Sequence, residues 1–156
     1  MNNPDDFLYE YSMIRFVPKI DREEFVNIGL IMMCKRRKWI RSKILINESR
    51  IKALFPDVSC EMLSHQVEFF LKDRVPFPDL PVEERYRWLT AMKSAMLQVS
   101  PSHPGLLSAN KESGALSDEA VRLWEEYERI NQEKNVIAIM LLEEEFDRLF
   151  SQLVEI

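Results

Sequence analysis

Hydrophobic residues change their spacing about a third of the way along the chain. Residues 7 to 17 (FLYEYSMIRFV), which end before Pro18, and residues 39 to 46 (WIRSKILI) are rich in the aromatic and β-branched types that favour strands. Residues 25 to 34 (FVNIGLIMMC) are almost continuously apolar, which is typical of a central strand covered on both faces. The polar run KRRK at 35 to 38 fits a four-residue hairpin loop. The start of the chain therefore predicts a three-stranded antiparallel meander.

Beyond the meander, apolar residues recur every three or four positions. Residues 48 to 55 (ESRIKALF) predict a short helix that stops at Pro56. Residues 59 to 73 (SCEMLSHQVEFFLKD) predict a second helix with His65 on its polar side. Pro81 suits the first turn of a third helix. The apolar stripe of that helix consists of Val82, Tyr86, Leu89 and Met92.

The rest of the chain predicts one more strand and two more helices. Residues 94 to 101 (SAMLQVSP) could continue the third helix or return as a fourth strand, and Pro101 favours the strand. Residues 105 to 116 contain two of the three glycines and predict a loop. Ser117 is a suitable N-cap for a helix that follows it. The last helix carries the apolar residues Leu142, Phe146, Leu149, Phe150, Leu153 and Val154.

Strands first and helices later are the pattern of an α+β domain. We predict a single domain over residues 1–156, with an antiparallel β-meander of three to four strands covered by C-terminal helices. Residues 7–47 form the meander, and residues 48–107 form helices and the fourth strand. Residues 108–156 form an acidic helical region. A chain of this length is sufficient for one hydrophobic core.

Composition indicates a folded protein without a membrane span. Hydrophobic residues make up 46% of the chain, which is ordinary for a packed domain. The longest apolar runs, at 28 to 34 and 136 to 142, are far shorter than the ~20 residues that cross a bilayer. The acidic N-terminus lacks the pattern of a secretory signal. Cys34 and Cys60 are the only cysteines, and two isolated thiols suit a reducing compartment, so we expect a cytoplasmic protein.

Charge is distributed unevenly along the chain. Residues 1 to 50 carry ten Lys and Arg against seven Asp and Glu, whereas residues 108 to 156 carry five against twelve. A basic N-terminal region and an acidic C-terminal region can orient a partner protein by electrostatic attraction. Alternatively, the charged residues simply form the solvated faces of the helices. In the acidic region, Trp124 and Tyr127 lie on the apolar stripe of the predicted helix. They are our candidates for partner binding if that stripe is exposed, and core residues if it packs inward.

Arg15, Asn27 and Gly29 are unexpected within the first two predicted strands. Simple alternation places Asn27 and Gly29 on one face, and a hairpin whose paired numbers sum to about 42 sets Arg15 opposite or diagonal to Asn27. A guanidinium and an amide above a glycine could bind a carboxylate or phosphate. The partner could instead be internal, such as Glu24, and the glycine could mark a bulge. Alternation assigns one face to Phe25, Asn27, Gly29, Ile31 and Met33, and the other to Val26, Ile28, Leu30 and Met32.

Other chemistry-bearing residues lack the spacing of a known motif. The two cysteines and two histidines show no close metal-ligand pair, so we predict no metal site and no cofactor. Ser100 and His103 lie close in sequence, but no nucleophile elbow surrounds the serine. The basic hairpin 35–43 (KRRKWIRSK) is the candidate nucleic-acid surface, because cations neutralise phosphates and an aromatic ring stacks on bases. The residues that would carry it are Arg36, Arg37 and Trp39.

A series of short motifs runs through the first two thirds of the chain. The motifs are Tyr11-Ser12-x-x-Arg15-x-x-Pro18, Arg22-Glu23-Glu24-Phe25-x-Asn27-x-Gly29, Arg50, Leu54-Phe55-Pro56-Asp57, Arg85-Tyr86-Arg87-Trp88-Leu89-Thr90-Ala91, Ser94, Gln98-Val99-Ser100-Pro101, His103 and Gly105. In this order they resemble a family of small bacterial proteins, the domain-of-unknown-function family numbered three-zero-three-seven. After residue 105 the chain departs from that pattern, because a long polar segment precedes the last helix.

The resemblance implies a fold family and an association with kinases similar to the HipA toxin. The function it favours is a non-catalytic protein-interaction or regulatory module that partners such a kinase. An alternative is a small-molecule or phosphate-binding enzyme that uses Arg15, Asn27 and His103, and a second alternative is nucleic-acid binding through the basic hairpin. The polar positions that the resemblance brings together, with Gly29 beside them, are Arg15, Glu24, Asn27, Arg85, Ser100 and His103.

Overall fold

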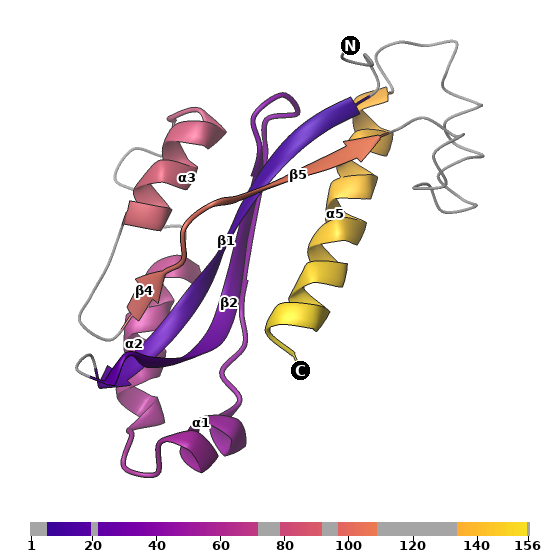
Figure 1. The fold of residues 1–156 in the computed structure, drawn as a ribbon. Helices are drawn as coiled ribbons and strands as arrows, with labels where there is room; N and C mark the ends of the chain where they lie inside the picture. The colour runs from indigo at the N-terminus through magenta and orange to yellow at the C-terminus, as the bar shows by residue number, and fades with distance from the viewer. Residues whose placement is uncertain (1–5, 20–21, 72–78, 92–96, 109–133, 156) are drawn as a thin grey trace.

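The computed structural model describes residues 6–19, 22–71, 79–91, 97–108 and 134–155 (Figure 1). These residues form a five-stranded antiparallel sheet in the order β3-β2-β1-β4, with β5 also paired to β1. Tyr11 pairs with Met32 of β2 and with His103 of β5, so β4 and β5 follow one another along the second edge of β1. The strands are β1 (Asp6–Lys19), β2 (Glu24–Cys34), β3 (Trp39–Ile44), β4 (Leu97–Val99) and β5 (His103–Ser108).

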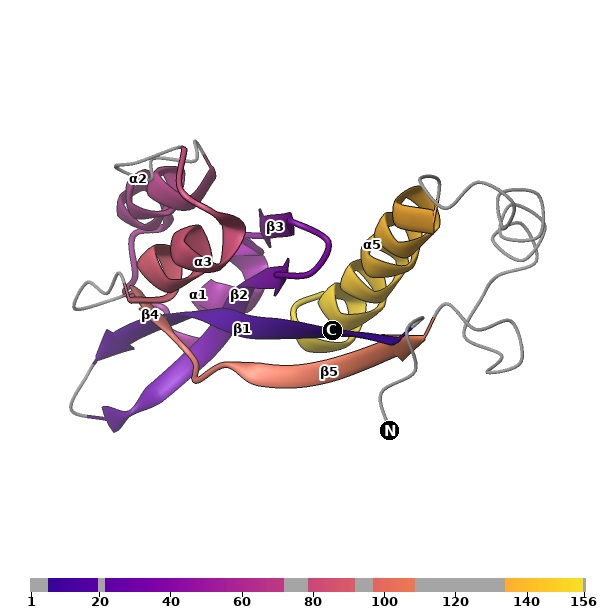
Figure 2. The same cartoon turned by 90° about the horizontal axis from the view of Figure 1, so that it is seen from above.

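Helices cover both faces of the sheet, which confirms the predicted α+β fold. Figures 1 and 2 show α1, α2 and α3 on one face and α5 on the other. Asn47 caps α1, because its side-chain oxygen accepts a hydrogen bond from the backbone N–H of Arg50 at 3.1 Å. His65 is exposed, as predicted. The helices are α1 (Glu48–Leu54), α2 (Cys60–Leu71), α3 (Val82–Ala91) and α5 (Lys134–Leu153).

Two strand predictions were wrong. β1 does not stop at Pro18, because Pro18 lies in an irregular stretch between the pairs Phe16–Val26 and Lys19–Glu24, where its missing N–H breaks no ladder bond. Residues 103 to 108 form β5, although a loop was predicted from residue 105 onward. The long β1 has a free edge beyond β4, and β5 pairs with it. The helix predicted after Ser117 lies outside the described residues.

A β-bulge in β2 reverses the predicted facing of its side chains. The register shifts between the pairs Ile14–Gly29 and Arg15–Asn27, so Ile28 is an extra residue in the ladder. Val26 and Ile28 therefore share a face with Ile31 and Met33, whereas Leu30 and Met32 point to the opposite face. The prediction from strict alternation fails at this bulge. Gly29 has little space above it, since an added Cβ would lie 2.8 Å from Cγ1 of Ile44.

The sheet separates two hydrophobic cores, one on each face. The first core packs under α5, and the second packs under α1, α2 and α3. No helix of the described residues is long and apolar enough to span a bilayer. The first core consists of Phe7, Tyr9, Leu30, Met32, Cys34, Trp39, Ile137, Ala138, Leu141, Leu142, Phe146, Leu149, Phe150 and Val154. The second consists of Ile14, Phe16, Val26, Ile28, Ile31, Met33, Ile51, Leu63, Val67, Val82, Tyr86, Leu89, Leu97 and Val99.

Candidate functional site

Arg15 and Asn27 are direct partners across β1 and β2, as the register argument allowed. The Arg15 guanidinium lies over the ring of Phe25, 4.2 Å from its centroid. The side-chain N–H of Asn27 donates to the carbonyl of Leu153 at 3.3 Å, and Arg50 donates to the carbonyl of Val154 at 3.0 Å. These contacts tie the C-terminal end of α5 to the sheet, since the last carbonyls of a helix lack partners within it.

The Arg15–Asn27 pair leaves two buried polar atoms without a hydrogen-bond partner, Nε of Arg15 and Oδ1 of Asn27. Both side chains are only partly buried as a whole. Glu24 is not their counterion, because it forms an ion pair with Arg22 at 2.9 Å beside the turn between β1 and β2. Each member of the pair has a structural contact: Asn27 with the end of α5, and Arg15 with the ring of Phe25.

The other predicted site residues lie elsewhere along the sheet. His103 stacks on Tyr11, with 5.2 Å between ring centroids. Tyr11 precedes Arg15 by four residues on β1, which corresponds to roughly 13 Å of extended strand. Arg85 is on α3, where it lines a cavity with residues of the β2–β3 loop. The Arg15, Asn27 and His103 constellation therefore does not converge on a single small-molecule site.

Ser100 has a structural role at the break between β4 and β5. Its hydroxyl oxygen accepts a hydrogen bond from the backbone N–H of Met13 at 2.8 Å, and its O–H donates to the carbonyl of Pro101 at 3.1 Å. Its own N–H donates to the carbonyl of Met13 at 2.9 Å. Ser100 thus extends the ladder by a side-chain bond, and its only proton is already donated. No hydrogen bond joins it to His103 in the described part of the chain.

A chain of hydroxyl groups connects the buried side of the sheet to the surface. Ser12 is fully buried and lies 2.8 Å from the hydroxyl of Tyr86, which lies 2.8 Å from that of Ser102. Ser102 lies 3.2 Å from a carboxylate oxygen of Glu10. Ionised carboxylates only accept, and each hydroxyl has one proton, so the donors run Ser12 to Tyr86 to Ser102 to Glu10. Burial raises the pKa of Tyr86.

The hydroxyl chain borders a cavity of about 290 Å³. Sequence analysis missed this cluster, although Ser12 and Tyr86 belong to the motifs that carry the family resemblance. No local spacing links residues 74 positions apart, and only the packing of α3 on β1 brings them together. The buried hydroxyls of Ser12 and Tyr86 already form a hydrogen bond with each other, so the cluster has a structural role in joining α3 to β1. The lining residues are Ser12, Thr90, Val99, Ser100, Pro101 and Ser102.

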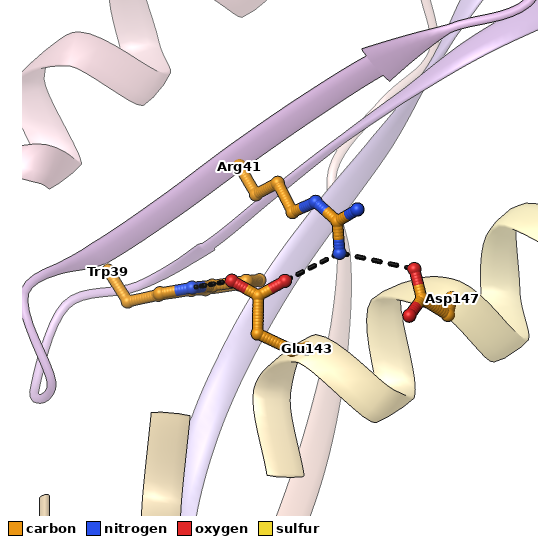
Figure 3. Close-up of polar contacts among 4 residues, drawn as sticks. All are labelled: Trp39, Arg41, Glu143 and Asp147. Atoms are coloured by element: carbon orange, nitrogen blue, oxygen red, sulfur yellow. Dashed lines mark hydrogen bonds and ion pairs between the residues drawn. The ribbon is translucent and has the colours of Figure 1, made fainter. Parts of the chain in front are cut away.

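The basic hairpin lacks the exposed aromatic residue that the nucleic-acid hypothesis requires. Trp39 is 7% exposed, and its indole N–H donates to Glu143 at 3.0 Å (Figure 3). Its ring therefore packs in the α5 core and does not offer a face to a base. Arg36 donates to the carbonyl of Asp6 at 2.7 Å, and the Arg37 guanidinium lies 5.4 Å from the centroid of the Phe7 ring.

An ion-pair cluster anchors α5 to β3. Arg41 bonds to Glu143 and, at 3.1 Å, to Asp147, and Figure 3 shows both carboxylates turned toward its guanidinium. The same guanidinium lies 4.3 Å from the centroid of the Phe146 ring. Glu143 accepts from both Trp39 and Arg41, so one carboxylate joins the indole and the guanidinium of β3 to the helix.

A second charged contact ties α5 to β1. The Tyr9 hydroxyl donates to Glu145 at 2.7 Å, and Arg148 pairs with the same carboxylate. Burial raises the pKa of Tyr9 and the bond to Glu145 adds to the effect. Burial would also raise the pKa of Glu145, but the hydrogen bonds from Arg148 and Tyr9 outweigh it and hold that pKa below its usual value.

Two exposed leucines lie opposite one another on β1 and β5. Leu8 is 66% exposed, and its partner Leu106 is 60% exposed. Strand alternation places Leu8 on the same side of β1 as Ser12, beside the region that α3 covers. We define the β1–β5 surface as Leu8, Glu10, Pro104 and Leu106. It is an apolar patch with an acidic neighbour.

Some predicted sites have no described geometry. Trp124 and Tyr127 lie outside the described residues, so their role in partner binding stays a prediction. Within the described ranges, no group of three or more His, Cys, Asp and Glu side chains could hold a metal ion. Cys34 is buried and Cys60 is partly buried, and both are free thiols.

Topology and site together define a class: a small α+β protein whose antiparallel sheet carries three helices on one face and a C-terminal helix on the other. Comparison with known families gives a particular assignment. Residues 11–121 match the family described as "Protein of unknown function (DUF3037)", and the chain belongs to that family. The comparisons found no matching curated protein and no matching solved structure.

Proposed function

We propose that this protein is a non-catalytic interaction module that binds a partner protein through the β1–β5 surface. The observation that carries the proposal is the direct pairing of Leu8 with Leu106, each more than half exposed. Single exposed leucines are common, but two in register on a sheet form one continuous patch. Association with a partner protein would remove this apolar surface from water, which favours binding.

The polar residues support a binding role over a catalytic one. Ser100 donates its proton within the sheet edge, Asn27 holds α5, and His103 stacks on Tyr11. Each therefore has a structural contact that accounts for its position. A nucleophile with an adjacent base, the arrangement that covalent catalysis requires, is not formed by these three residues.

The partner that we propose is a kinase similar to HipA, the association that the family resemblance implies. Glu10 beside the two leucines favours a partner face with an apolar centre and a cationic rim, because complementary charge speeds encounter and fixes orientation. Binding energy would come mainly from burying Leu8 and Leu106. We place this encounter in the cytoplasm.

The test is direct binding between the purified protein and a purified HipA-like kinase from the same cells, measured by biolayer interferometry. We expect the Leu8→Glu/Leu106→Glu variant to bind at least about tenfold more weakly, because two charges would be buried in the interface. Leu54→Glu is the matched control, since Leu54 is 54% exposed on α1, away from this surface.

Unchanged binding by the double variant would remove the β1–β5 surface from the interface. If the native protein does not bind the kinase, the kinase is the wrong partner. A pull-down from native cells with native and double-variant protein would then identify any protein that depends on the two leucines, by mass spectrometry. Circular dichroism of each variant excludes unfolding as the cause of lost binding.

A further inference from the structure

A second cavity lies between the β2–β3 loop and the start of α3. Its volume is about 510 Å³, which is within the range of roughly 300–1,000 Å³ that small-molecule sites occupy. Both segments lie at the same end of the sheet (Figure 1). The residues that line it are Lys35, Lys38, Asp79, Leu80, Pro81, Val82, Glu83 and Arg85.

Three cations line this cavity. Lys35, Lys38 and Arg85 make no ion pair with any residue that the structure describes, although Asp79 and Glu83 line the same cavity. The nearest ion pair on α3 joins Glu84 to Arg87 at 3.2 Å. The lining therefore holds three cations against two carboxylates, and none of the three cations is ion-paired with a described residue.

Among these three cations, Arg85 has a buried donor without an acceptor in the described residues. Its Nε is buried and has no hydrogen-bond partner, and the side chain as a whole is only partly exposed. A buried guanidinium N–H without an acceptor is unfavourable, since guanidinium groups have five donors and no acceptor. An acceptor that enters the cavity would satisfy Arg85 and bring Lys35 and Lys38 within reach of the same anion.

We propose that this cavity binds a phosphate ester carried on a small hydroxylated molecule, the chemistry that sugar phosphates and mononucleotides share. Arg85 would bind the phosphate through its planar fork, and the two lysines would neutralise the second charge. Asp79 and Glu83 would repel a bare anion, but they accept hydrogen bonds from hydroxyl groups beside the phosphate. The site is distinct from the β1–β5 surface and does not depend on the proposed protein partner.

The same loop carries the nucleic-acid hypothesis, but the observations favour a small ligand. Trp39 is buried against α5, so no aromatic ring of this hairpin stacks on a base. Binding of a single strand uses an open groove with stacking platforms, whereas these cations line one cavity closed on one side by α3.

The test is isothermal titration calorimetry with ribose 5-phosphate and with inorganic phosphate, at low ionic strength. We expect ribose 5-phosphate to bind more tightly, and both affinities to fall as salt is added. Arg85→Gln and the double variant Lys35→Gln/Lys38→Asn should each bind at least about tenfold more weakly. Asparagine suits position 38, where φ is 52°. Lys52→Gln is the control, because Lys52 pairs with Glu48 on α1.

Each remaining outcome would overturn the proposal. Absence of heat with either ligand at millimolar concentration, or equal binding by native protein and both cavity variants, would show that the cavity is not a phosphate site. Equal affinity for the two ligands would refute the hydroxyl role of Asp79 and Glu83. Tighter binding of a short single-stranded oligonucleotide than of ribose 5-phosphate would make this hairpin a nucleic-acid surface. Thermal unfolding of each variant shows whether lost binding comes from lost folding.

Discussion

The ring of Tyr9 lies directly over Gly105, its partner across β1 and β5. A Cβ added to Gly105 would lie 2.0 Å from Cζ of the tyrosine, far inside van der Waals contact. We therefore predict that Gly105→Ala destabilises the protein by about 1–3 kcal/mol through overpacking, as measured by urea unfolding.

A double-mutant cycle checks the cause of this loss. In a Tyr9→Ala background the ring is absent, so Gly105→Ala should cost much less, giving clear non-additivity. Additive effects would mean that the alanine acts through the backbone and not through the ring.

Glu143 should be the most important charged residue for docking α5. Glu143→Ala removes the acceptor of both Trp39 and Arg41 and leaves a buried indole N–H without a partner. We expect a loss of about 1–2 kcal/mol in the free energy of unfolding. Glu143→Gln should lose less, because an amide oxygen can still accept from the indole.

Asp147→Ala provides the matched control for Glu143. Its side chain also contacts Arg41 but is 65% exposed, so its removal should change stability by less than about 0.5 kcal/mol. Equal losses for the two alanine variants would contradict the role assigned to Trp39 in this contact.

Tyr86→Phe should destabilise the protein more than an exposed tyrosine would. The substitution removes the acceptor of the Ser12 hydroxyl, and Ser12 is fully buried. We expect a loss of about 1–2 kcal/mol, measured by chemical unfolding. The double variant Ser12→Ala/Tyr86→Phe should recover part of it, because both unsatisfied partners are then gone. A double variant that is no more stable than Tyr86→Phe alone would argue against this pairing.

Stability should fall at alkaline pH because of Tyr9. Burial and the bond to Glu145 raise its pKa in the folded state above the usual value of 10, so the folded protein holds this proton more tightly than the unfolded chain does. The contribution is complete below about pH 10 and is lost as pH rises further. Tyr9→Phe should therefore flatten the decline in unfolding free energy above about pH 10. An unchanged slope would show that Tyr9 is not the responsible group.

Sequence predicted the meander because its signals are local. The alternating and continuous apolar runs, the KRRK loop and the helical spacing after Asn47 each depend on near neighbours. The pairing of Arg15 with Asn27 is one of the two placements, opposite or diagonal, that a hairpin with paired numbers summing to about 42 allows. Gly29 within the strand indicates that a bulge can form near it, but the sequence does not specify Ile28 as the extra residue, because the pairing with β1 sets that position.

The remaining errors concern contacts between distant residues. β5 was missed because Pro104 and Gly105 are poor strand residues, and only the long free edge of β1 and the Tyr9 ring make this strand favourable. The hydroxyl chain from Ser12 to Glu10 joins residues of three segments. The cavity beside Arg85 depends on where α3 packs, which no spacing in the sequence specifies.

The residues that match the family are fewer than the residues that the fold needs, because α5 lies outside the match. The family match ends at residue 121, yet α5 begins at Lys134 and packs on the face of the sheet opposite α1, α2 and α3. Leu30 and Met32, inside the matched segment, are fully buried in the core that α5 closes. A protein cut at the family boundary would therefore expose a large apolar sheet face. Its parts could be recombined with other domains only if α5, or another amphipathic helix, came with them.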